Sequence, residues 1–287
     1  MATVKREFIF IVCILSAIGA LLTLVSLVTE QWVVTDNALW LSQGLTKPNT
    51  IKYGLFQGFY TQEEPSPLTV QLTMTCLIGE NVCALLCGKN DDERNELLRQ
   101  LYNNDANAVQ NNDNCPTIQR SLSPWASTGG VSRADTEESD DKKFINAGVW
   151  VSTIFFLSVS IAFGLASSAL SIWNIVSNPV QVYFSIFGLY ISNAIALTCT
   201  VIGMCLWGVM HIQITFHDVG IFYTLSGQMT SDKSAGLGYS YWILFVPIIF
   251  YCASIILLYV RHFLLSRDPG HKRVQREDVA DPGIYLY

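Results

Sequence analysis

The sequence predicts a mostly α-helical membrane protein, a bundle of four transmembrane helices that carries a small extracellular antiparallel β-sheet. The first observation is composition: of 287 residues, 51% are hydrophobic and only 14% are charged, which is too apolar for a soluble globular domain. The second is a set of four apolar stretches, each long enough to cross a bilayer: residues 8–28, 149–173, 183–209 and 241–260. The third is residues 68–78, where apolar and polar side chains alternate as in a half-buried strand.

The four apolar stretches contain no Asp, Glu, Lys, Arg or His. As a helix the first would extend about 31 Å, close to the thickness of one hydrocarbon core. No small-x-small cleavage site follows it at residues 28–32, so we count it as a retained span rather than a signal peptide. The chain is therefore expected to cross the membrane four times, with both termini on the same side.

Basic residues flank the outer ends of the first and last spans. Lys5 and Arg6 lie in the N-terminal segment 1–7, and five more basic residues lie in the tail 261–287. By the positive-inside rule both segments are cytoplasmic. Residues 29–146 then form a large extracellular loop, residues 174–182 a short cytoplasmic turn containing Pro179, and residues 210–240 a second extracellular loop. The large loop holds 16 of the 23 acidic residues, which argues against nucleic acid as a partner.

The two extracellular loops carry the signals for the sheet. We expect strands at residues 31–41, 51–61, 68–78 and 219–225, which are rich in β-branched and aromatic residues. Residues 91–102 differ, because acidic residues fill the first turn and Leu97, Leu98, Leu101 and Tyr102 share one face; this pattern predicts a short amphipathic helix. Residues 103–141 are rich in Asn, Ser, Asp and Glu and are interpreted as a mobile insert.

The eight cysteines divide between the large loop and the spans. An even number in an oxidising compartment predicts two disulfides in the loop, with three pairings open. A tetrahedral zinc site is disfavoured, because the spacing is not that of a zinc motif. The loop cysteines are Cys76, Cys83, Cys87 and Cys115, and those of the spans, interpreted as small packing residues, are Cys13, Cys199, Cys205 and Cys252.

Catalytic motifs are absent from the sequence. It has no Gly-x-Ser-x-Gly, no phosphate-binding loop and no His-Glu-x-x-His, so we expect no enzyme activity, no cofactor and no metal site. The uncharged spans also argue against a pump or secondary transporter. His211, His217 and Asp218 follow the third span, but their spacing matches no metal motif, and we interpret these histidines as solvated.

Small residues recur at every fourth position in the second and third spans, which lets helices approach closely. We expect these faces to pack the bundle internally rather than to form an oligomer interface, and Asn193 to hydrogen-bond between helices. Pro247 is expected to kink the fourth span. The small-residue faces comprise Ser160, Gly164 and Ser168 in the second span and Gly188, Ser192, Ala196 and Thr200 in the third.

Four spans with a β-rich, cysteine-bearing first outer loop resemble the claudin-like superfamily. Trp32 and Gly54-Leu55-Phe56 are similar to the Trp and Gly-Leu-Trp elements of that superfamily, with Phe56 in place of the second Trp. Within the superfamily the chain most resembles the clarin family, although its first outer loop is longer and it has no Asn-x-Ser/Thr sequon. The residues that carry this resemblance are Tyr53 to Phe56 with Gly58, Asn174, Pro179, Gly188-Leu189-Tyr190, Tyr241-Trp242, Arg261 and Tyr287.

Clarins are non-enzymatic membrane organisers linked to hair bundles, ribbon synapses, actin-associated plasma membrane, hearing and vision. The resemblance therefore implies a plasma-membrane scaffold of sensory cells, which lies among membrane lipids, couples other membrane proteins laterally and has an indirect link to actin. Two other functions stay open: an auxiliary subunit of an ion channel, and claudin-type cell adhesion or a paracellular pore.

The C-terminal tail ends in Ile284-Tyr285-Leu286-Tyr287. A free carboxylate with Tyr287 at the last position and Tyr285 at the third from last suits a PDZ groove, where a peptide adds a strand to a sheet. The alternative is that the apolar tail lies on the lipid interface, where Tyr is favoured. The sequence leaves both interpretations open.

Overall fold

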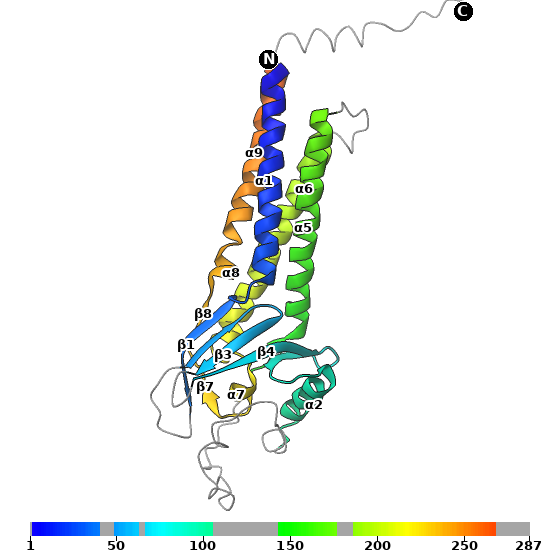
Figure 1. Ribbon diagram of the computed structural model, residues 1–287. Coiled ribbons are helices and arrows are strands. Elements are labelled where there is room, and N and C mark those ends of the chain that lie inside the picture. The colour runs from blue at the N-terminus through cyan, green and yellow to red at the C-terminus, as the bar shows by residue number, and fades with distance from the viewer. Residues whose placement is uncertain (1, 41–48, 63–66, 106–142, 177–185, 268–287) are drawn as a thin grey trace, which may run out of the picture. The chain divides into compact units, whose positions relative to one another are not determined.

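The computed structural model describes residues 2–40, 49–62, 67–105, 143–176 and 186–267 (Figure 1). The chain divides into two compact units. Residues 1–24, 156–202 and 243–287 form the first, here called the helical unit, and residues 25–155 and 203–242 form the second, here called the sheet unit. The mobile insert expected at residues 103–141 lies, from residue 106 onward, outside the described residues.

Four long apolar helices of the described chain are able to cross a membrane. They are α1 (Ala2–Val28), α5 (Ala147–Val176), α6 (Ile186–Met210) with its π-helical continuation η2 (His211–Thr215), and α9 (Phe245–Arg267), preceded by the short α8 (Tyr239–Trp242). The helices run past the apolar stretches, because hydropathy detects where the apolar run ends and not where the helix ends; Arg6 and Arg261 are both helical. The protein is a multi-pass membrane protein.

The fourth span is broken between α8 and α9. Pro247 has no N–H to give to the carbonyl of Ile243, and the N–H of Val246 donates to that carbonyl instead, at 3.1 Å. A kink was predicted at Pro247; the structure instead interrupts the helix at Ile243 and Leu244, one turn before the proline.

The sheet unit is built on an eight-stranded antiparallel sheet. Its order is β6-β5-β4-β3-β2-β1-β7, and β8 also pairs with β1. Consecutive strands of the large loop are therefore neighbours, as β1 to β4 are in Figure 1. The strands are β1 (Val33–Trp40), β2 (Asn49–Tyr53), β3 (Gln57–Gln62), β4 (Leu68–Leu77), β5 (Val82–Leu86), β6 (Ile145–Asn146), β7 (Met229–Thr230) and β8 (Ala235–Leu237).

Two strand predictions need correction. Residues 51–61 form two strands, β2 and β3, because the chain turns at Gly54-Leu55-Phe56. The strand predicted at residues 219–225 is wrong: Phe222–Leu225 form the short helix α7, and only Ile221 makes a bridge, to Leu85 of β5. The second outer loop joins the sheet through β7 and β8 instead. β5 itself escaped prediction, because Val82–Leu86 is nearly all buried and shows no alternation.

The amphipathic helix is confirmed as α2, Asp91–Tyr102, with Asp91, Asp92 and Glu93 in its first turn. It packs against β4 and β5 and buries Leu97, Leu98 and Leu101. Tyr102 was expected on the same face but is 43% exposed, and its ring lies 6.0 Å from that of Phe144. The apolar face is thus one residue narrower than the sequence suggests.

Candidate functional site

Trp32 joins the end of α1 to the sheet within the sheet unit. Its side chain is fully buried, and its Nε1 donates a hydrogen bond to the carbonyl of Ser26 at 2.7 Å. Its backbone N–H donates to the carbonyl of Tyr53, the last residue of β2, at 2.9 Å. The rings of Trp207 and Tyr241 lie edge-on to it, at centroid distances of 5.3 and 6.2 Å. Trp32 is therefore the centre of an aromatic cluster with rings from α6 and α8.

Residues 53–58, here called the motif turn, need two glycines for steric reasons. A Cβ on Gly54 would collide with the carbonyl oxygen of Thr29, just beyond α1, and a Cβ on Gly58 would collide with Tyr53. The N–H of Gly54 donates to the carbonyl of Gln57 at 2.8 Å and closes the turn. The motif turn thus lies directly against the residues that follow α1.

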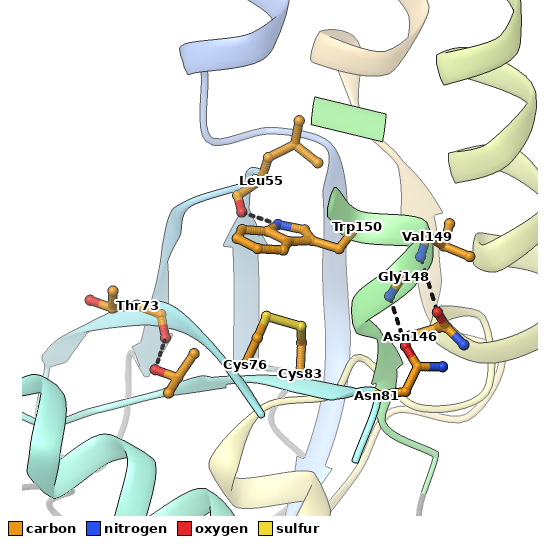
Figure 2. The surroundings of a disulfide bond; sticks show 10 residues. Leu55, Thr73, Cys76, Asn81, Cys83, Asn146, Gly148, Val149 and Trp150 are labelled. Carbon is orange, nitrogen blue, oxygen red and sulfur yellow. Dashed lines mark hydrogen bonds between the residues drawn. A yellow bond between two sulfur atoms is a disulfide. The ribbon is translucent and has the colours of Figure 1, made fainter. Parts of the chain in front are cut away.

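Leu55 and Phe56 at the tip of the motif turn differ in their environment. Leu55 is fully buried, and its carbonyl accepts a hydrogen bond from Nε1 of Trp150, in the first turn of α5, at 2.7 Å (Figure 2). The side chain of Phe56 is 43% exposed, although its carbonyl accepts a bond from the N–H of Met74. The residue at which the chain departs from the Gly-Leu-Trp element is therefore outside the core.

One of the expected disulfides joins Cys76 of β4 to Cys83 of β5, which face each other in the register of the two strands (Figure 2). Cys87 is also in a disulfide. Cys115 lies outside the described residues. The four cysteines of the spans, Cys13, Cys199, Cys205 and Cys252, are free thiols. Cys13 and Cys199 are buried, as expected of packing residues, whereas Cys252 is half-buried and Cys205 is exposed, so the packing interpretation is wrong for Cys205.

The small-residue faces lie inside the helical unit, as predicted. Ser160, Ser192, Asn193, Ala196 and Thr200 are buried, as are Gly164 and Gly188, and Ser168 is half-buried. These faces are therefore used in internal packing.

Asn193 links three helices of the helical unit. Its Nδ2 donates to Oγ of Ser167 in α5 at 2.6 Å and to the carbonyl of Leu189 at 2.8 Å, while Oγ of Ser16 in α1 donates to its Oδ1 at 2.9 Å. A second polar contact joins α5 to α6, where Ser160 and Thr200 lie 2.6 Å apart. The interhelical hydrogen bonds expected of Asn193 are present.

Gly164 and Leu189 pack against the remaining helices of the same unit. A Cβ on Gly164 would collide with the hydroxyl of Tyr251 in α9, so the glycine makes room for that ring. Leu189 belongs to an apolar cluster with Ile9, Val12 and Leu258, against which Tyr190 also packs.

The histidines near the end of the third span are not both solvated. His211 is only 6% exposed, and its Nδ1 lies 2.7 Å from Oγ1 of Thr215 within η2, so the prediction was wrong for this residue. His217 is partly exposed and pairs with Asp232 at 3.0 Å. Asp218 accepts hydrogen bonds from the N–H of Gly220 at 2.9 Å and from the hydroxyl of Thr224 at 2.6 Å. No group of three metal-ligating side chains occurs in the part of the chain that the structure describes.

Two buried tyrosines of the sheet unit, Tyr53 in β2 and Tyr223 in α7, have raised pKa values. Burial raises the pKa of Tyr53 far above its ordinary value, with a smaller contribution from the negative charge of Asp218. Burial also raises the pKa of Tyr223, whose ring lies 4.9 Å from that of Tyr60.

Several predicted residues are peripheral or not described. Trp242 is largely exposed and donates from Nε1 to the carbonyl of Leu237 at 3.2 Å. Pro179, Tyr285 and Tyr287 lie outside the described residues. Conversely, sequence reasoning missed Trp150 and Trp207, because a tryptophan near the end of a span usually indicates the lipid interface and not an internal contact.

A scan against protein-family models finds no match for the chain, and a comparison with curated proteins finds none either. The assignment of a fold therefore rests on the architecture. Four apolar helices, an antiparallel sheet built mainly from the first outer loop, and a disulfide within that sheet fit the claudin-like four-span membrane fold.

Proposed function

We propose that the protein is a clarin-like organiser of the plasma membrane in sensory cells, a non-enzymatic scaffold that holds other membrane proteins beside it. The observation that carries the proposal is the placement of the residues on which the resemblance rests. Trp32, Tyr53 and Leu55 are fully buried, and Gly54 and Gly58 allow close backbone packing. The resemblance therefore concerns residues that hold the sheet unit together, which supports a shared architecture more strongly than matching surface residues would.

The distribution of polar groups in the helical unit is compatible with a scaffold. The buried Ser16, Ser167 and Asn193 bond to one another, and Ser160 bonds to Thr200. Polar side chains of this kind join helices. Large apolar side chains of the spans, such as Leu165 and Ile172, are exposed and suit lipid or a partner helix. Partner recognition is accordingly assigned to the exposed sides of the spans and to the surface of the sheet unit.

The orientation that we propose places the sheet outside the cell and both termini in the cytoplasm. Disulfides form in the secretory pathway and persist at the cell surface, so the Cys76–Cys83 bond supports an outer location for the sheet. The cytoplasmic tail would then present Tyr285 and Tyr287 to PDZ scaffolds and, through them, to actin.

Proximity labelling in native sensory cells tests the proposal. The bait is the full chain with the labelling enzyme at its N-terminus, and the matched control carries one extra Ala after Tyr287, which blocks a PDZ carboxylate site without changing the membrane part. We expect both baits to label the same plasma-membrane proteins and only the unmodified bait to label PDZ scaffolds.

Two other experimental results would assign a different function to the protein. Stoichiometric co-purification with one pore-forming protein would identify a channel subunit, and aggregation of otherwise non-adherent cells that express the chain would identify an adhesion molecule. Recovery of the same scaffolds with and without the extra Ala would refute the PDZ interaction.

A further inference from the structure

The turn between β4 and β5 presents an isoleucine that the sheet does not cover. Ile78 is 67% exposed, and it opens a tight turn closed by the N–H of Asn81, which donates to the carbonyl of Ile78 at 3.2 Å. The base of the turn is fixed by the pairing of Leu77 with Val82 and by the Cys76–Cys83 disulfide one residue further along. An apolar side chain is thus held at the tip of a rigid hairpin.

This turn lies against the beginning of a membrane-spanning helix. Oδ1 of Asn81 accepts a hydrogen bond from the N–H of Gly148 at 2.8 Å, and the carbonyl of Asn81 accepts one from the N–H of Ala147 at 3.3 Å (Figure 2). These are the first two residues of α5. Asn81 therefore caps the N-terminus of α5, where the first backbone N–H groups of a helix lack partners within it.

The apolar surface of α5 begins within one turn of that cap. Val151 is 45% exposed and Phe155 is 59% exposed, whereas Trp150 between the cap and this surface is half-buried. At 1.5 Å per residue, Val151 is about 4.5 Å further along the helix than Gly148. The headgroup layer on each side of a bilayer is about 5 to 7 Å thick, so the capped end of α5 falls within this layer when Val151 reaches the hydrocarbon.

We propose that the β4–β5 turn is a lipid-binding site, with Ile78 inserted into the interfacial layer of the leaflet on the sheet side. The occupant is lipid because Asn81 of the turn lies on the side of α5 to which a Cβ on Gly148 would point. Phe155, seven residues after Gly148, lies on the same side of the helix and is exposed, and a spanning helix presents such apolar side chains to the bilayer. Glu80, two residues after Ile78, is exposed and needs water, so the insertion reaches the headgroups and the upper acyl chains only. The turn thereby gives the sheet unit a contact with the membrane that is separate from its spans.

Depth-dependent fluorescence quenching tests this proposal. A coumarin-bearing amino acid is placed at position 78 of the full chain, in phosphatidylcholine nanodiscs with or without lipid that carries a spin label at the fifth acyl carbon. The matched control has the probe at Thr69, an exposed residue near the other end of β4, about 30 Å along the strand. Both positions are exposed, and mapping of the Cys76–Cys83 bond in each labelled protein verifies that the hairpin is intact.

We expect the spin-labelled lipid to quench the probe at position 78 and to leave the probe at position 69 nearly unchanged. Equal quenching at the two positions, or none at position 78, would overturn the proposal. A third result would also overturn the proposal: the lipid leaves the probe at position 78 unquenched, and the probe becomes shielded from water only when a second membrane protein is present. That result would assign the turn to a protein partner.

Discussion

Trp32 and Gly54 together explain why the motif turn lies where it does. The indole N–H of Trp32 binds the last turn of α1, while its backbone N–H binds the end of β2. The glycine lets the turn approach the carbonyl of Thr29. The Tyr53-Gly54-Leu55-Phe56 pattern indicated this site from the sequence. The exposure of Phe56 and the burial of His211 could not be predicted, because each depends on contacts between residues distant in the chain.

Gly54→Ala is expected to prevent folding of the sheet unit, since the added methyl group would collide with the backbone near Thr29. Gly79→Ala is the matched control, because a Cβ there has no atom within 4 Å, and we expect its effect on the free energy of unfolding to stay within about 0.5 kcal/mol. Surface expression and thermal unfolding of the purified variants measure both. Normal expression of the Gly54 variant would contradict the steric account.

A second matched pair is Tyr53→Phe and Tyr60→Phe. The buried hydroxyl of Tyr53 has no hydrogen-bond partner among the described residues, whereas that of Tyr60 donates to Oδ1 of Asn49 at 3.2 Å. We expect Tyr53→Phe to maintain or raise the free energy of unfolding and Tyr60→Phe to lower it by about 1 kcal/mol. Chemical denaturation of the two variants in detergent gives the comparison, and a larger loss for Tyr53→Phe would be the contrary result.

The raised pKa of Tyr53 predicts that the stability of the protein depends on pH in the alkaline range. The folded-state pKa of Tyr53 is raised, so its neutral form stabilises the protein fully below the unfolded pKa of about 10, and this contribution is lost as pH rises above that value. We expect the melting temperature to fall less steeply above pH 10 in Tyr53→Phe than in the unmodified protein. Identical slopes of melting temperature against pH in the two proteins would show that Tyr53 does not cause the alkaline loss of stability.

At the scale of elements, patterns with a clear period were reliable. α2 and β4 carry strong helical and alternating patterns, and both are present at almost the predicted bounds. β5, β6, β7 and β8 were missed, since they are either buried without alternation or only two or three residues long. Such strands exist because a neighbouring strand provides their hydrogen bonds, and single-sequence patterns do not record a neighbour.

The β4–β5 hairpin makes the disulfide prediction specific. With Cys76 and Cys83 joined, two disulfides in the large loop leave Cys87 and Cys115 as the second expected pair. Replacing Cys76 and Cys83 by Ser is expected to lower the free energy of unfolding by about 2 to 3 kcal/mol, the value for closing a loop of this length. Mass mapping under non-reducing conditions checks the pairs, and a Cys76–Cys87 or Cys83–Cys87 link would contradict them.

At the scale of the whole molecule, the number of spans could be predicted from composition and hydropathy, and the presence of the sheet from the alternating and β-rich patterns of the loops. The bilayer imposes a length and an apolar character on each span, so the signal is local and strong. The sidedness of the chain is predicted from its flanking charges. The arrangement of the two loops depends on pairing between segments far apart in sequence, such as β1 with β8. A four-span chain with the sheet on one side and both termini on the other is the central claim.

Epitope labelling in intact cells tests this claim most directly. Tags are placed at Met1, after Tyr287 and next to Gly129 in the large loop, and each is probed with antibody before and after permeabilisation of the plasma membrane. We predict that the tag at Gly129 is reached in intact cells and that both terminal tags are reached only after permeabilisation. Labelling of one terminus alone in intact cells would contradict the four-span count, and labelling of both termini would contradict the orientation.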